Sequence, residues 1–88
     1  MLRISGDAVT RASVVLRLEG RVGGPWVDEL ALACEGVLRK GQCLTLDLAG
    51  TTFVDTQGAA LLRQLHGRRV TFVNCSPFVA EQLVGDGR

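Results

Sequence analysis

The sequence lacks most of what catalytic and metal-binding sites require. Its 88 residues include three cysteines and one histidine, His66, and no two cysteines form a C-x-x-C pair. These spacings match neither a redox motif nor a set of metal ligands. No nucleophile–base pair or carboxylate dyad is legible, and no glycines form the phosphate-binding G-x-G-x-x-G pattern. We therefore expect no enzymatic activity, no cofactor and no metal site.

The sequence also has no excess of one sign of charge and no long apolar run. Ten basic and nine acidic side chains give a net charge of +1, and no basic stripe with interleaved aromatic residues occurs. This balance argues against direct nucleic-acid binding. The apolar runs are too short to cross a bilayer, and the N-terminus opens without the apolar segment of a signal peptide. We therefore expect a cytoplasmic protein without membrane insertion.

The length and composition predict one small globular domain over residues 1–88, with a core spanning about residues 13–84. Apolar residues make up 47% of the chain and charged residues 22%, which is typical of a folded globular protein. A chain this short has no room for a second hydrophobic core. No internal repeat, linker or low-complexity run divides it.

Two hydrophobic periods alternate along the chain. Apolar–polar alternation predicts strands at 13–19 and 44–48, the latter with an extension at 52–54. A weak first strand is expected at 2–4, followed by a turn at 5–7, and another strand at 70–73. Helical spacing predicts helices at 25–40, at 56–66 and from 77 onward, the first opening on Pro25 and the last capped by Ser76. The order β-β-α-β-α-β-α implies two parallel crossovers.

The alternation at residues 44–48 also predicts how the sheet is covered. Its leucines point to one face, while Thr45 and Asp47 point to the other. The strands of a parallel sheet that is covered on both faces usually have continuously apolar sequences. We therefore expect helices on one face and a partly wet second face.

The candidate functional site is the junction of a strand and a helix at Asp55-Thr56-Gln57-Gly58. Asp55 can cap the helix by accepting a hydrogen bond from the N–H of Gln57 or Gly58, and Gly58 allows close backbone packing. Thr56 would then place its hydroxyl near solvent in the first turn. A phosphoryl group there would add a charge of about −2, which a helix N-terminus tolerates and a partner fitted to a neutral hydroxyl does not. An Asp-Thr pair is also an ordinary N-cap, so spacing alone leaves a purely structural role open.

Three segments, in this order, resemble the elements of STAS domains. Residues 16–22 read LRLEGRV and resemble the first long strand; residues 44–58 read LTLDLAGTTFVDTQG and resemble the central signature. Residues 72–77 read FVNCSP, precede Val79, and resemble a later element. Together they cover most of the chain from Val14 to Val84. The resemblance implies an α/β fold with a mixed, mostly parallel sheet of four to five strands, about three helices mainly on one face, and no enzymatic activity.

The resemblance is to the anti-sigma factor antagonists within this family. In those proteins the residue after the signature aspartate is a serine or threonine that a cognate anti-sigma factor kinase phosphorylates, and the dephosphorylated form binds that kinase. Thr56 occupies this position and is the candidate phosphoacceptor. Asp55, Thr56, Gln57 and Gly58 form the predicted partner-binding segment. The resemblance thus implies a bacterial regulator of transcription that switches partners and binds an anti-sigma factor kinase or a related regulator.

Two alternatives stay open within the same family. Some small STAS proteins are accessory subunits that dock on the ATPase of phospholipid-transporting ATP-binding-cassette complexes, and these often carry aspartate-threonine at this junction, as Asp55-Thr56 does here. Such a subunit needs no phosphorylation. The other alternative is an adaptor that has kept the fold and lost the switch, because Gln57 stands where the family usually has a small residue.

Two smaller features have structural explanations. Trp26, the only tryptophan, lies on an apolar helical face, where core packing is favoured over a role as an interface anchor. Arg63, His66, Arg68 and Arg69 form a basic cluster at the end of the second predicted helix, where cations complement the helix dipole.

Overall fold

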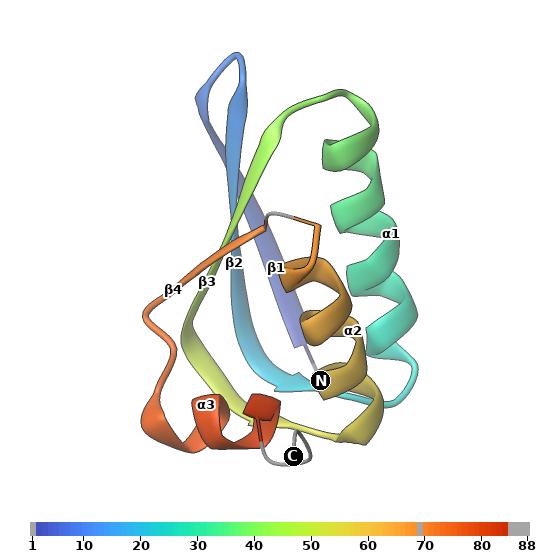
Figure 1. Cartoon of the computed structure of the whole chain (residues 1–88), viewed down its shortest axis with the longest axis vertical. Helices are drawn as coiled ribbons and strands as arrows, with labels where there is room; N and C mark the ends of the chain where they lie inside the picture. Colours follow the sequence, from blue (N-terminus) through green and yellow to red (C-terminus); the bar gives the residue numbers. More distant parts are fainter. Residues whose placement is uncertain (1, 69, 85–88) are drawn as a thin grey trace.

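The computed structural model describes residues 2–68 and 70–84, which form four strands and three helices. The predicted order β-β-α-β-α-β-α is confirmed (Figure 1). The elements in chain order are β1 (Leu2–Thr10), β2 (Ser13–Val22), α1 (Trp26–Arg39), β3 (Cys43–Val54), α2 (Thr56–His66), β4 (Thr71–Val73) and α3 (Pro77–Val84).

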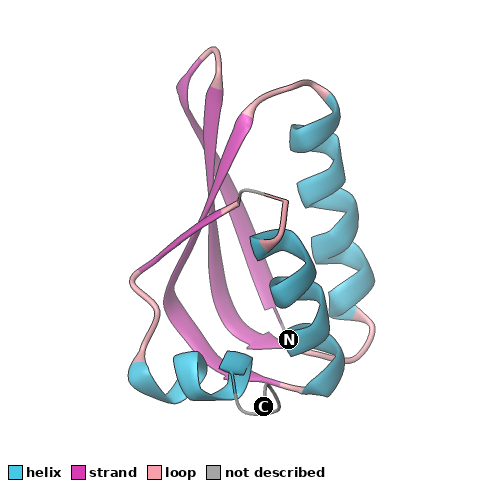
Figure 2. Cartoon of the chain, viewed as in Figure 1, coloured by secondary structure: helices cyan, strands magenta, loops and turns pink. Residues whose placement is uncertain are grey.

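The four strands form one mixed sheet in the order β1-β2-β3-β4. β1 runs antiparallel to β2, while β3 runs parallel to both β2 and β4. The crossover helices α1 and α2 lie side by side on the same face of the sheet, and α3 lies across its lower end (Figure 2). The predicted mixed, mostly parallel sheet with helices mainly on one face is therefore confirmed.

The hydrophobic core lies between the sheet and the helices. On β3, Leu44, Leu46 and Leu48 are buried, whereas Thr45 and Asp47 lie on the opposite face and remain partly exposed. The predicted division between a covered and a wet face is therefore confirmed. The other buried apolar residues of the core are Leu2, Leu16, Leu18, Val22, Leu30, Cys34, Val54, Ala59, Leu62, Leu65, Val70 and Val79.

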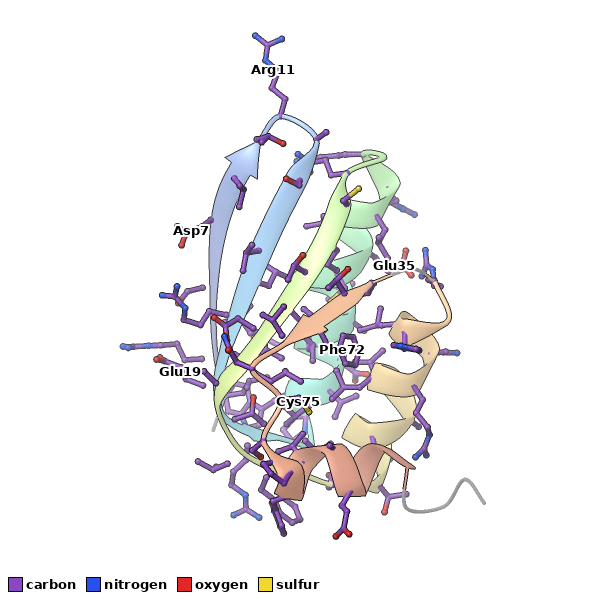
Figure 3. The ribbon with its side chains drawn as sticks, turned by 60° about the vertical axis from the view of Figure 1, so that its left-hand side comes forward. Asp7, Arg11, Glu19, Glu35, Phe72 and Cys75 are labelled. Carbon is purple, nitrogen blue, oxygen red and sulfur yellow. The ribbon has the colours of Figure 1, made fainter. Side chains whose placement is uncertain are left out.

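The uncovered face of the sheet carries charged pairs. Arg3 pairs with Glu19 at 3.7 Å, and Arg17 pairs with Asp47 at 3.7 Å. Figure 3 shows Glu19 pointing away from the helices, toward solvent. Water screens exposed ion pairs of this kind, so this face is solvated and adds little to stability.

The first hairpin differs from the sequence prediction. The predicted turn at residues 5–7 is wrong, because β1 continues through it to Thr10 and the chain reverses at residues 11–12. Gly6 instead lies opposite Leu16 within the sheet, where a Cβ would come within 3.2 Å of the leucine Cδ2 atom. The Thr10 hydroxyl accepts a hydrogen bond from the N–H of Ala12 and so shapes the actual turn.

Two element boundaries also need correction. The segments predicted as a strand and its extension form one continuous strand, β3, whose pairing with β2 shifts register after Arg17 and again after Gly20. Pro25 is the N-cap of α1 rather than its first helical residue. The predicted start and end of α2 at Thr56 and His66 are confirmed.

Candidate functional site

Asp55 connects the end of β3 to the start of α2. Its backbone is extended, and its Oδ1 atom accepts a hydrogen bond from the N–H of Gly58 at 2.7 Å. The predicted N-cap is therefore confirmed, with Gly58 as the donor. The carbonyl oxygen of Asp55 accepts from the N–H of Ala59 at 2.8 Å and closes the first helical turn. Such a cap contributes about 0.5–2 kcal/mol of stability.

The same carboxylate also holds the loop between β2 and α1. Its Oδ2 atom accepts a hydrogen bond from the N–H of Gly24 at 3.0 Å, while the N–H of Asp55 donates to the carbonyl of Val22 at 3.0 Å. One residue thus ties the end of β2, the following loop and α2 together. The sequence analysis missed this contact.

Close backbone packing at this junction requires two glycines. A Cβ on Gly58 would lie 2.4 Å from the carbonyl oxygen of Val22, and a Cβ on Gly23 would lie 2.5 Å from the Oδ2 atom of Asp55. Neither distance is compatible with a side chain unless the surrounding atoms move. The prediction that Gly58 permits close packing is confirmed, and Val22 is the group that packs against it.

Thr56 and Gln57 form the exposed part of the junction. Both residues are solvent-exposed in the first turn of α2, whereas Gly58 and Ala59 behind them are buried. The structure therefore brings Asp55, Thr56 and Gln57 to one surface, with Gly58 forming its packed base. The first turn of α2 contains no acidic residue, so the nearest acidic residue in the chain to an added negative charge on Thr56 would be the N-cap Asp55. The phosphoacceptor and partner-binding roles stay predictions.

A pocket of about 240 Å³ lies beside this junction. It is lined by Arg21, Trp26, Phe53, Asp55 and the loop backbone at 23–25. Arg21 and Phe53 are register partners in the β2–β3 pair, and the guanidinium carbon of Arg21 lies 5.1 Å from the centroid of the Phe53 ring. This is the geometry of a cation–π contact.

Trp26 belongs both to the core and to this pocket. Its side chain is half-buried and packs against the core cluster, as the sequence analysis favoured, and it also lines the pocket. Since it follows Gly23 and Gly24, the hydrogen bond from Gly24 to Asp55 helps to fix where the ring lies.

Comparisons with known proteins agree with this arrangement. Neither the models of known protein families nor the curated protein sequences give a match to the chain. Among solved structures, the anti-sigma factor antagonist SpoIIAA in its unphosphorylated form superimposes with a TM-score of 0.68. The alignment has 23% identity and covers 91% of this chain and 80% of that one. An antisigma-factor antagonist STAS domain from Rhodobacter sphaeroides gives a TM-score of 0.67 at 17% identity, over 83% and 86% of the two chains. The chain has the STAS fold.

The segments that resemble STAS signatures coincide with structural junctions. Residues 44–58 comprise nearly all of β3 and the first turn of α2, which is the junction held by Asp55. Residues 72–77 join β4 to α3, where the hydroxyl of Ser76 accepts a hydrogen bond from the N–H of Val79 at 3.1 Å. The predicted cap at Ser76 is therefore confirmed.

At the C-terminal end of α2, one residue of the predicted basic cluster forms an ion pair with another helix. Arg68 forms a hydrogen-bonded ion pair with Glu35 on α1, and this bond lowers the pKa of the Glu35 carboxyl. Figure 3 shows Glu35 beside the chain that leaves α2. Arg63 and His66 lie in the last turn of α2 and are exposed, and Arg69 of the predicted cluster lies outside the described residues.

The three thiols lie apart from the junction. Cys34 is buried in the core, and burial raises its pKa to about 11. Burial also raises the pKa of Cys75, which is half-buried between β4 and α3, while Cys43 is exposed at the start of β3. Within residues 2–68 and 70–84, no three histidine, cysteine, aspartate or glutamate side chains gather as metal ligands would, and no helix is long and apolar enough to cross a bilayer.

Proposed function

We propose that this STAS-fold protein is a cytoplasmic, non-enzymatic binding module that exchanges protein partners according to the state of the Thr56 hydroxyl. The observation that carries the proposal is the position of Thr56. It is exposed, and it directly follows Asp55, whose carboxylate joins the start of α2 to the β2–α1 loop. A change at Thr56 therefore occurs where a partner would contact both α2 and that loop.

The switch rests on unequal effects of charge on folding and on binding. A phosphoryl group on Thr56 would add a charge of about −2 at the positive end of the α2 dipole. The first turn of α2 has no acidic residue of its own, and the carboxylate of the preceding Asp55 is held by the N–H groups of Gly24 and Gly58, so the fold can accept the group. A partner packed against a neutral hydroxyl would lose that contact, because the charged group must stay hydrated.

The proposed partner is an anti-sigma factor kinase or a related regulator of transcription, with Thr56 as its phosphorylation site. Two lines of support agree. Asp55, Thr56 and Gly58 match the family signature around the phosphoacceptor position, while Gln57 departs from it, and two of the similar structures are anti-sigma factor antagonists by name.

Affinity capture from the native cells tests the proposal. Tagged wild-type protein, Thr56→Asp and Gln64→Glu are compared, with mass spectrometry of bound proteins and of Thr56 itself. Gln64 is exposed further along α2, so this control adds a charge away from the junction. We expect wild type and Gln64→Glu to capture the same kinase-like regulator, Thr56→Asp to lose it, and a phosphoryl group to be detected on Thr56.

The opposite results identify the alternatives. Capture of a transport ATPase would support the accessory-subunit interpretation. Capture of the same partners by all three proteins, without phosphate on Thr56, would support an adaptor without a switch. Either result would contradict partner switching.

A further inference from the structure

We infer that the pocket beside Asp55 is an anchor site for a protein partner that presents an apolar side chain next to a carboxylate. The apolar side chain would enter between Trp26 and Phe53, and the carboxylate would pair with Arg21. This inference rests on the proposed function in one respect, since it names the chemistry of the partner that the Thr56 surface binds.

The size and lining of the pocket fit a single side chain. Its volume of about 240 Å³ lies below the roughly 300–1,000 Å³ typical of pockets for small molecules. Two aromatic rings, Trp26 and Phe53, contribute to the wall, and the loop backbone at 23–25 contributes another part. Aromatic pockets that receive one partner side chain are typical of the few residues that dominate an interface energetically.

Arg21 supplies the unmatched charge. The arginines Arg3, Arg17 and Arg68 each pair with a carboxylate of this chain. Within the described residues Arg21 makes no such pair, and its contact is with the Phe53 ring. Stacking on that ring holds the planar guanidinium at the pocket while its N–H donors can still bind a carboxylate.

Arg21 and Asp55 are the charged residues that line the pocket, and the attraction for a partner carboxylate comes from Arg21. The helix that carries Thr56 has no acidic residue, and its basic residues Arg63 and His66 lie in the last turn, at the end away from the pocket. Asp55 does line the pocket, but each of its carboxylate oxygens already accepts a backbone N–H. Asp28 and Glu29 lie in the first turn of α1, where they complement that helix dipole, so the partner carboxylate is expected at Arg21 and not beside α1.

An acidic partner also explains why charge at Thr56 would act as a switch. The added phosphoryl group would lie one residue from Asp55, which lines the pocket. A partner carboxylate bound at Arg21 would then meet a new negative charge close by. Like charges brought together in an interface strongly disfavour the complex, so the regulatory partner would be released.

A titration with two dipeptides tests the pocket without the partner. The probes are acetyl-phenylalanyl-glutamate amide and its neutral analogue, acetyl-phenylalanyl-glutamine amide, added to ¹⁵N-labelled full chain and followed by NMR. We expect both to shift the amides of Gly23 and Gly24 and the indole N–H of Trp26. The acidic probe should bind roughly two- to fivefold more tightly, as an exposed ion pair allows. Arg21→Gln should remove that difference, and Phe53→Leu should weaken both probes.

Arg3→Gln is the matched control, because Arg3 is exposed on the open sheet face and pairs with Glu19. It should leave both affinities unchanged. Equal affinity of the two probes for the wild type, or shifts that map to another surface, would overturn the inference. Because the titration contains neither a partner nor a phosphoryl group, such a result would leave the Thr56 switch to be judged by affinity capture alone.

Discussion

The Oδ2 atom of Asp55 accepts a hydrogen bond from the backbone N–H of Gly24 at 3.0 Å, across 31 positions of the chain. The other carboxylate oxygen caps α2 through Gly58. Asp55 therefore fixes the entry to α2 and the loop before α1 at the same time. Five predictions, including the two already given for Thr56 and the pocket, depend on this junction or on the core behind it.

Replacing Asp55 should cost more than the loss of a simple helix cap. Asp55→Ala removes acceptors for the N–H groups of both Gly24 and Gly58. A cap contributes about 0.5–2 kcal/mol and a further hydrogen bond about 1 kcal/mol, so we expect a loss of roughly 1.5–3 kcal/mol in urea unfolding. Asp7→Ala is the control, since Asp7 is exposed on β1 and points away from the sheet (Figure 3). Equal losses for the two variants would show that Asp55 has no special structural role.

Alanine should have opposite effects at two glycines in helices. Gly58→Ala would place a Cβ 2.4 Å from the carbonyl oxygen of Val22, so α2 must shift and stability should fall by about 3 kcal/mol. At Gly36, within α1, a Cβ would meet no atom within 4 Å. Gly36→Ala should therefore raise stability by about 0.5–1 kcal/mol. Both are measured by urea unfolding, and two changes of the same sign would contradict the packing described at Gly58.

Stability should decrease in alkaline solution because of Cys34. Burial raises the pKa of this thiol from 9.0 to about 11, so the unfolded chain releases a proton at lower pH than the folded chain does. The stabilisation is complete below pH 9.0 and is lost as the pH rises toward 11, by about 1 kcal/mol near pH 10. The sequence has no tyrosine, which leaves few other groups to titrate in this range.

Urea unfolding at several pH values measures this effect. Cys34→Ala should be less stable near neutral pH, because it leaves a small cavity, but its stability should vary less between pH 9 and 11. Cys43→Ser is the control, since Cys43 is exposed, and it should keep the wild-type dependence. An unchanged pH dependence in Cys34→Ala would show that another group is responsible.

The local features of this chain were predictable because they depend on neighbouring residues. Alternating leucines identified β3 and its covered face, and the limits of α2 followed from the cap at Asp55 and the helical spacing up to His66. The predicted turn at residues 5–7 was wrong because it was inferred from turn-forming residue types alone, whereas pairing with β2 holds these residues in a strand. Gly6 is needed there for its packing against Leu16 across the hairpin.

The site was only partly predictable, for a related reason. The residues Asp55 to Gly58 are contiguous, so their spacing showed a helix start. The pocket depends on Arg21 and Phe53 becoming partners after the register between β2 and β3 shifts at Gly20. No local pattern predicts such a shift, and nothing in the sequence linked Gly24 to Asp55. The features that the sequence analysis missed are therefore those that depend on contacts between residues far apart in the chain.

The short length of β4 has a consequence for self-association. This edge strand offers only Thr71–Val73 for pairing before Asn74, whose φ of 57° turns the backbone out of the strand direction. A second copy could therefore extend the sheet by only a few hydrogen bonds at this edge, and the opposite edge, β1, carries charged Arg3 and Asp7. Both are means by which sheet proteins avoid growing into fibrils. Binding of a partner through loops and helix ends, as proposed above, would then leave no long, uncharged strand edge within the described residues exposed to aggregation.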